Sequence, residues 1–319
     1  MGRYIVKRFL MLIPVIFGVS LLLYIMMDLA PGSVIDILSG DMTTEQVAEL
    51  EHEYGYDRSV FYRYFNYMAN LLQGDMGYSF IYKQPVWKLY MQRFPHTLKL
   101  AGASVLVCVV LSIPLGVQAA THHGSLTDNF CSVLSILGLS MPNFWLGLML
   151  MVLFSLKLGW LPASGDENGI LSLIMPAFTV GTGMMATLMR TTRSSMLDVL
   201  RQDYLRTARS KGVSEKAVVN KHALKNALIP IITVVGGEIG SCIGGATVTE
   251  NVFTWPGVGR MLIDAIKQRD ITTVTGCLIV STALVGVIHV IIDVLYAYVD
   301  PRLKSKYVRP KKKVKEAAK

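Results

Sequence analysis

Glu238 is the ionisable residue whose surroundings most suggest a function. It lies near the middle of an apolar stretch that is rich in glycine. If that stretch crosses a membrane, a charge facing lipid would be costly, so the carboxylate should face a helix bundle or a water-filled path. There it could attract a cationic group. The alternative, left open, is a protonated or hydrogen-bonded glutamate at an interface with another subunit.

Other reactive side chains indicate structure rather than chemistry. His289 and Asp293 are four residues apart and share a helix face, where a structural hydrogen bond is favoured over a proton relay. The adjacent His122 and His123 cannot converge on one ion and are interpreted as a solvated turn. The four cysteines have no metal or redox spacing and are expected to be small buried hydrophobes, namely Cys108, Cys131, Cys242 and Cys277.

Motifs typical of enzymes are missing from the sequence. It has no Gly-rich loop ending in Gly-Lys-Ser or Gly-Lys-Thr, no H-E-x-x-H and no G-x-S-x-G. We therefore predict no catalytic, cofactor-binding or metal-ligating residue in this chain.

The elements that position these residues are apolar blocks of membrane-spanning length. The chain has 319 residues, of which 52% are hydrophobic and 17% charged. About 20 apolar residues are needed to cross the hydrocarbon of a bilayer. The blocks predict about six transmembrane helices in an all-α, polytopic fold, at about 9–30, 97–120, 131–156, 173–192, 227–249 and 273–299.

The net charge of +9 does not indicate nucleic acid, because the charges are segregated. Basic residues gather near the N-terminus, in 190–225 and in 302–319, whereas 30–96 is rich in acids. Alternating basic and acidic segments follow the positive-inside rule and predict that both termini are cytoplasmic. The first block is longer than a signal-peptide core and is expected to be a retained span.

Four regions follow from this alternation. Residues 1–30 form the N-terminal span, and 31–96 form a small helical extracellular insert. Residues 97–300 form a core of five spans, and 301–319 form a basic cytoplasmic tail. Within the insert, Thr43 and Gln46 predict a capping box that opens a short helix. A second helix is expected from about Arg58 to Gln73, and a third, after Pro85, leads into the second span.

The cytoplasmic segment 193–226 predicts two helices that meet at a turn. Leu197, Leu200 and Tyr204 recur at helical spacing, and Gly212 breaks the pattern. From Asp203 to Pro230 the segment resembles the EAA loop of bacterial ABC importer permeases, in the form found in the dipeptide, oligopeptide and nickel group. Ala208 and Gly212 hold the places of that pattern's second alanine and its glycine. Arg206 and Thr207 replace the Glu and Ala of the general pattern, a departure that this group shares.

Further motifs of the same group appear in order along nearly the whole chain. They are the stretches 74–79, 140–145, 161–165, 250–259 and 300–302. The resemblance implies a pathway shared with a homologous second permease, two cytoplasmic ATPases that bind ATP and Mg, and a substrate-binding protein outside. It implies the permease subunit of a di- or oligopeptide importer that works by alternating access in the bacterial inner membrane. By this resemblance, the chain would contact the lipid bilayer but no nucleic acid, and it would bind no cofactor.

The resemblance also suggests which residues carry the function. The coupling residues are Asp203, Tyr204, Leu205, Arg206, Thr207, Ala208, Arg209, Lys211 and Gly212. An amphipathic helix here can dock in a groove of an ATPase, although it could instead lie on lipid. The translocation path is assigned to Glu238, Gly240, Gly244 and Glu250. Trp255, Pro256 and Gly257 are expected to form an outer gate or a binding-protein contact, with an interfacial aromatic anchor as the alternative.

Two other functions remain in competition. A nickel or metal-chelate importer of the same family is the nearer one, although no ligand cluster is visible in the sequence. A self-sufficient channel is the other, and it would have no use for an ATPase-coupling loop.

Overall fold

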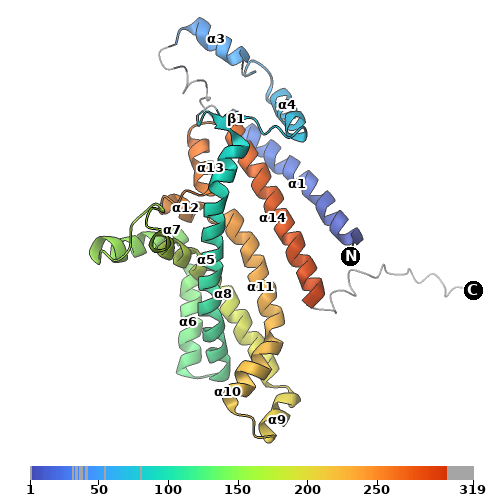
Figure 1. Cartoon of the computed structure of the whole chain (residues 1–319), viewed down its shortest axis with the longest axis vertical. Helices are drawn as coiled ribbons and strands as arrows, with labels where there is room; N and C mark the ends of the chain where they lie inside the picture. The colour runs from blue at the N-terminus through green and yellow to red at the C-terminus, as the bar shows by residue number, and fades with distance from the viewer. Residues whose placement is uncertain are drawn as a thin grey trace, which may run out of the picture.

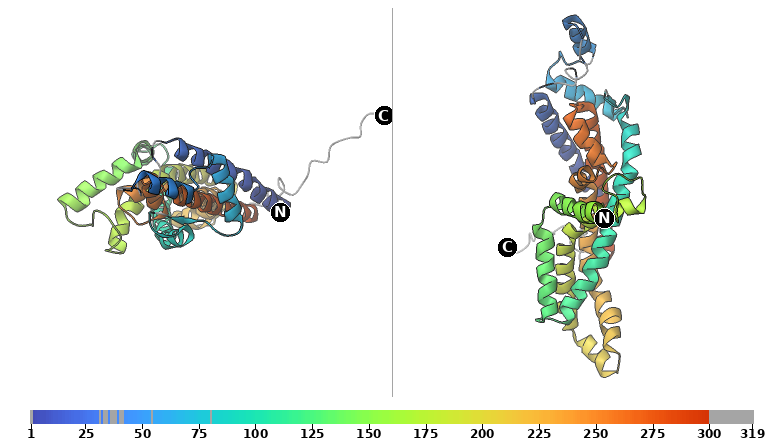
Figure 2. Two further views of the ribbon diagram at one scale, coloured as in Figure 1. Left: turned by 90° about the horizontal axis from the view of Figure 1, so that it is seen from above. Right: turned by 90° about the vertical axis from the view of Figure 1, so that its left-hand side faces the viewer.

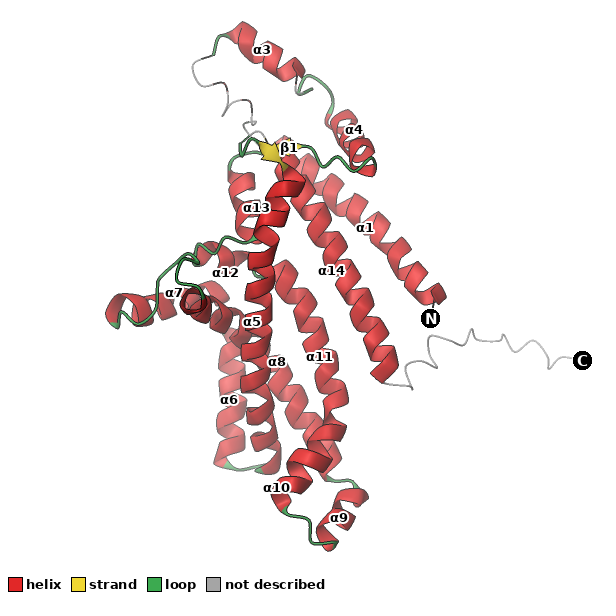
Figure 3. Ribbon diagram, in the orientation of Figure 1, coloured by secondary structure: helices red, strands yellow, loops and turns green. Residues whose placement is uncertain are grey.

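A computed structural model describes residues 2–299, apart from 31, 33–34, 36–38, 40–41, 54 and 80. This part of the chain is almost entirely helical (Figure 3). Five helices in it are long and apolar enough to cross a membrane, or six spans if one bent helix pair counts as one. Four of the five lie within α1 (Gly2–Leu29), α5 (Val86–Thr121), α8 (Ile170–Leu200) and α14 (Ile271–Val299). The other, Glu215–Cys242, is formed mostly by α11 (Leu224–Gly245). The all-α polytopic fold is confirmed.

The long helices α5, α8 and α11 pack side by side and contribute the largest buried cluster (Figure 1). Leu100, Leu188 and Ala227 are fully buried there. The hydroxyl of Ser112 on α5 donates to the carbonyl oxygen of Met185 on α8 across 3.3 Å. A polar side chain that bonds across two spans is satisfied away from lipid, which stabilises the pair.

The predicted insert contains α3 (Thr44–Glu53) and α4 (Val60–Leu72). The predicted capping box is present, because the backbone N of Thr43 lies 3.0 Å from Gln46 Oε1 and the backbone N of Gln46 lies 3.4 Å from Thr43 Oγ1. The buried Tyr64 of α4 lies 2.9 Å, through its hydroxyl, from Ser20 Oγ of α1. The insert is therefore fastened to the first span.

The third helix predicted for the insert is continuous with the second span. A two-residue hairpin, β1 (Tyr78–Ser79) and β2 (Gln84–Pro85), leads directly into α5. With 36 residues, α5 is about 54 Å long, well beyond the hydrocarbon thickness. The predicted boundary at residue 96 thus falls inside one helix, whose N-terminal end lies in the predicted insert.

The apolar block 131–156 is not one straight span. It contains α6 (Leu126–Ser140), α7 (Asn143–Leu150) and the π-helix η1 (Met151–Lys157), with a bend of 101° between α6 and the following pair. Figure 2 shows α7 and η1 projecting sideways from the bundle. Pro142 explains the break, because it forces the preceding Met141 out of the helical region, to φ −83° and ψ 125°.

Short helices complete the described chain. They are α9 (Asp203–Ser210), α10 (Glu215–Ala217), the π-helix η2 (Val218–Ala223), α12 (Thr247–Val252) and α13 (Val258–Lys267). In Figure 1, α9 and α10 lie at the end of the molecule opposite to the insert. The residues of the predicted tail, 301–319, lie outside the described part.

Candidate functional site

The predicted coupling segment forms α9, which follows α8 after only two residues. Leu205 is fully buried and packs in the main cluster with Met196 of α8 and Val218 of η2. Ala208 is half-buried, and the other residues of the predicted coupling set on this helix are exposed, namely Asp203, Tyr204, Arg206, Thr207 and Arg209. One apolar anchor thus holds a short helix whose remaining surface is free to meet another protein.

A turn closed by polar contacts joins α9 to the next helices. Gly212 has φ +78°, a conformation that disfavours side chains, and Lys211 and Gly212 are exposed. Arg209 donates two hydrogen bonds to Glu215, Nε to Oε2 at 3.0 Å and Nη2 to Oε1 at 2.7 Å. The amide of Asn226 donates to the Tyr204 hydroxyl at 2.8 Å. These contacts are absent from the sequence-based prediction, because residues 6 and 22 positions apart show no helical spacing.

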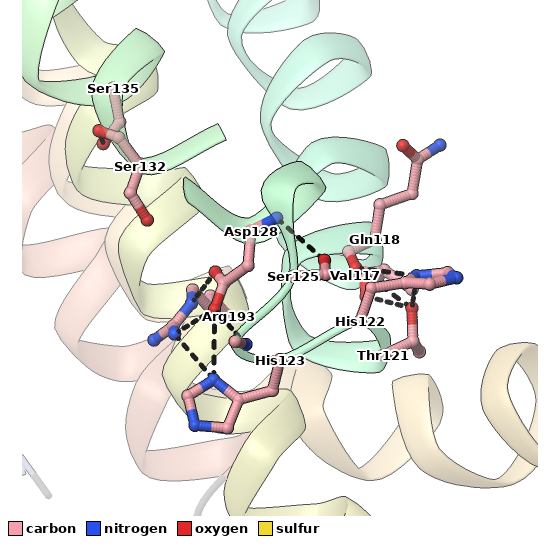
Figure 4. A network of polar contacts seen from close by, with 11 residues as sticks. Val117, Gln118, Thr121, His122, His123, Ser125, Asp128, Ser132, Ser135 and Arg193 are labelled. Atoms are coloured by element: carbon pink, nitrogen blue, oxygen red, sulfur yellow. Dashed lines mark hydrogen bonds and ion pairs between the residues drawn. The ribbon is translucent and has the colours of Figure 1, made fainter. Parts of the chain in front are cut away.

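A second polar network lies at the same end of the bundle (Figure 4). Asp128 at the start of α6 is almost fully buried. Arg193 of α8 donates to both of its carboxylate oxygens, at 2.6 and 2.7 Å. The backbone N of Gly124 donates to Asp128 Oδ2 at 3.0 Å, and His123 Nδ1 lies 3.0 Å from the same oxygen. His123 is therefore part of a network, whereas the imidazole Nδ1 of His122 lies near the Thr121 hydroxyl and the Gln118 carbonyl oxygen, at 3.1 and 3.2 Å. The network fixes the α5–α6 turn to the helix that leads into α9.

Glu250, predicted for the path, is fully buried in α12. Its carboxylate accepts hydrogen bonds from Thr97 Oγ1 at 2.7 Å and from the backbone N of Arg260 at 3.0 Å. Thr97 Oγ1 also accepts a bond from the backbone N of Val258 at 2.9 Å. A Cβ atom on Gly257 would overlap the carboxyl group of Glu250, so only glycine fits there. Glu250 lies outside the spans, and its burial raises the pKa of its carboxyl group above the ordinary value.

The backbone N of Trp255, in the predicted gate, donates to the carbonyl oxygen of Glu250 at 2.8 Å. The Trp255 side chain is 3% exposed, and its indole Nε1 donates to the carbonyl oxygen of His96 at 2.9 Å. His96 Nδ1 lies 3.0 Å from Asp166 Oδ2. The indole is therefore buried among the described residues, and its predicted role stays a prediction. The motifs 161–165 and 250–259, distant in sequence, meet here, since the backbone N of Gly165 donates to the carbonyl oxygen of Phe253 at 3.0 Å.

The remaining path residues lie on α11. Glu238 is half-buried, and Gly240 is buried against α14, where a Cβ atom would be 2.8 Å from His289 Cε1. The surroundings of Gly244 and the side chain of Asp293 lie outside the described part of the chain. Their predicted roles remain predictions.

No group of three or more His, Cys, Asp or Glu side chains that could hold a metal ion occurs among the described residues. The four cysteines are buried and free, as predicted.

Comparison with known proteins finds relatives that are all described as membrane components of transport systems. The family described as "Binding-protein-dependent transport system inner membrane component" matches residues 112–305, and its N-terminal companion family matches residues 1–101. The chain is 41% identical to the oligopeptide transport system permease protein AppB of Bacillus subtilis, over 95% of this chain and 99% of that protein. It is 39% identical to the di/tripeptide transport system permease protein DppB of Pseudomonas aeruginosa, over 95% and 99%. It is 37% identical to the glutathione transport system permease protein GsiC of Escherichia coli, over 96% and 100%.

A solved structure shares the fold. An inward-facing structure of the MetNI methionine ABC transporter superposes with a TM-score of 0.56 at 18% identity, covering 67% of this chain and 97% of that chain. At this identity the likeness concerns the fold alone.

Proposed function

Because this chain belongs to the family of binding-protein-dependent transport system inner membrane components, we propose that it is the permease subunit of an importer for di- or oligopeptides. The relatives named as oligopeptide and di/tripeptide permeases, which match over nearly the full chain, support that cargo. The structural observation that carries the proposal is α9, an exposed short helix anchored by the fully buried Leu205.

In this proposal α9 docks into a groove of a cytoplasmic ATPase. An amphipathic helix that inserts its exposed face into a groove is a common recognition mode. The exposed Arg206 would meet acidic groups at the rim of that groove. Since two residues separate α9 from α8, a movement of the docked ATPase would be transmitted to the spans. ATP and Mg²⁺ would be bound by two such ATPase subunits and not by this chain.

The chain would form half of the path, with a homologous second permease forming the rest. A substrate-binding protein would deliver cargo on the side of the insert, and both termini would lie in the cytoplasm. Glu238, Gly240, Gly244 and Glu250 are proposed to border the path, and Trp255, Pro256 and Gly257 to move with its outer gate. The contacts of Trp255 with His96 and of Glu250 with Thr97 connect this region to the outer end of α5.

Isolation of the intact assembly tests the proposal. The tagged chain would be purified from its native membranes in a mild detergent and the co-purifying proteins identified by mass spectrometry. We expect a second permease and ATPase subunits, and a peptide bound to any co-purifying binding protein. A binding protein loaded with nickel or a chelate would change the cargo. A single species that conducts solute without partners would establish a channel and refute the proposal.

A further inference from the structure

A cavity of about 320 Å³ lies where the apolar block 131–156 breaks. Its wall is formed by the break itself, by α8 and by α11. The residues that matter for the argument are Met141, Asn143, Gly183, Met184, Ser241 and Cys242. The cavity thus joins three segments of the sequence, 138–143, 180–184 and 241–242.

Two polar side chains face this cavity from different helices. Asn143 is exposed, and its amide makes no hydrogen bond to another described residue. A Cβ atom on Gly183 would be 2.9 Å from Asn143 Oδ1. The glycine therefore makes space for the Asn143 amide beside α8. Ser241 is exposed and donates to the carbonyl oxygen of Gly237 at 3.3 Å, which leaves its own oxygen able to accept.

These side chains fit a polar occupant better than lipid. Asn143 is the first residue of α7, at the bend inside the apolar block 131–156. A polar group without a partner is costly in hydrocarbon, whereas one that lines a water-filled cavity is satisfied by water or ligand. A primary amide offers both donors and an acceptor, the complement of a peptide group.

The rest of the cavity wall is apolar and includes flexible side chains. Met141 and Met184 line the cavity, and Cys242 Sγ lies 3.2 Å from Met184 Sδ. Unbranched thioether side chains adapt their shape and are common where one surface accepts many partners. A site that binds many peptides needs fixed hydrogen bonds to the backbone that all peptides share. It also needs adaptable contacts to the side chains in which they differ.

We propose that this cavity is a peptide-binding subsite of the transport path, in which Asn143 and Ser241 hydrogen-bond the backbone of a short peptide. The inference rests on the proposed function and extends it to a specific site. Glu238 precedes Ser241 by three residues and shares its face of α11, which brings the predicted path carboxylate close to the same region.

Cysteine labelling tests whether the cavity wall is accessible to water and whether a peptide binds there. In a chain whose four native cysteines are replaced by alanine, Ser241→Cys would be compared with Ile239→Cys. Ile239 is exposed at nearly the same depth but about 200° around the helix. The importer, in native membranes and shown to take up radiolabelled alanyl-alanine, would react with a charged, membrane-impermeant thiosulfonate. We expect rapid labelling of Ser241→Cys alone, slowed several-fold by excess alanyl-alanine.

Transport kinetics give an independent readout. Loss of one or two hydrogen bonds in Asn143→Ala should raise KM for alanyl-alanine roughly three- to tenfold at unchanged kcat. Asn143→Gln should restore part of the loss, and Asn129→Ala, at an exposed asparagine of α6, should change nothing. If peptide uptake is normal but Ser241→Cys is not labelled, or is labelled at the same rate with excess alanyl-alanine, the subsite proposal is wrong. An unchanged KM in Asn143→Ala would also refute it. Neither result would refute the proposed function. An unsubstituted importer that takes up no peptide would overturn the proposed function, and the subsite with it.

Discussion

Arg193 of α8 forms a bidentate salt bridge with Asp128 of α6, with Nε 2.6 Å from Oδ1 and Nη2 2.7 Å from Oδ2. The Asp128 side chain is 5% exposed and that of Arg193 is 27% exposed. Bidentate, charge-assisted pairs are stronger than neutral hydrogen bonds and fix geometry as well. This pair therefore holds the α5–α6 turn against α8, the helix that precedes the proposed coupling segment (Figure 4).

Breaking the pair should destabilise the chain. In Asp128→Asn the half-buried guanidinium of Arg193 loses its ionic partner, which should reduce stability by about 2 kcal/mol. Thermal unfolding of the purified complex would show a lower melting temperature. The exposed neighbour Thr127 offers a control, as Thr127→Ala. If Asp128→Asn melted like that control, the pair would not hold the two helices together.

The two arginines of α9 should behave differently. Arg206 is exposed with no ion pair among the described residues, so Arg206→Glu should abolish uptake but leave the melting temperature unchanged. Arg209 holds Glu215, so Arg209→Glu should also loosen the turn. Adding Glu215→Arg to Arg209→Glu should restore the turn. Both properties are measurable, as peptide uptake and as protease sensitivity of the 203–215 segment. Equal effects of the two single variants would contradict the assignment.

Glu250 should make stability depend on pH. Burial raises the pKa of its carboxyl group in the folded state. The folded state therefore favours the protonated form, so this contribution to stability is complete below the ordinary pKa of glutamate and is lost as pH rises through the raised pKa. Glu250→Gln should flatten the decline of the melting temperature as the pH rises above the ordinary pKa of glutamate. Glu167→Gln, at an exposed glutamate, should keep the slope of the unsubstituted protein, and a parallel slope in Glu250→Gln would refute the prediction.

Gly257 should tolerate no side chain while Glu250 is present. Because a Cβ atom would overlap the Glu250 carboxyl group, Gly257→Ala should cost about 1–3 kcal/mol through overpacking. Its backbone is extended, with φ −89° and ψ 179°, so strain of the backbone adds nothing. Combining Gly257→Ala with Glu250→Ala should show positive coupling in a double-mutant cycle of unfolding free energies. Additive losses would mean that the two residues do not compete for space.

The sequence predicted well what is local or strongly periodic. The capping box of Thr43 and Gln46 depends on residues three apart, and the helix expected from about Arg58 to Gln73 depends on regular apolar spacing; both occur. The break at Pro142 was missed because the apolar block continues through it, although the effect of proline on Met141 was a usable signal. The pairing of Asp128 with Arg193, 65 residues apart, carries no periodic signal. The burial of Glu250 follows from its contact with Thr97 across 153 residues, which no local pattern encodes.

Reconstitution tests the central claim most directly. The complete complex would be placed in proteoliposomes with ATP on the side of α9 and radiolabelled alanyl-alanine with the binding protein on the side of the insert. A matched preparation would carry Arg206→Glu. The account predicts peptide accumulation that requires ATP and binding protein and is lost in Arg206→Glu while the subunits remain associated. Uptake that proceeds without ATP, or that survives Arg206→Glu undiminished, would contradict it.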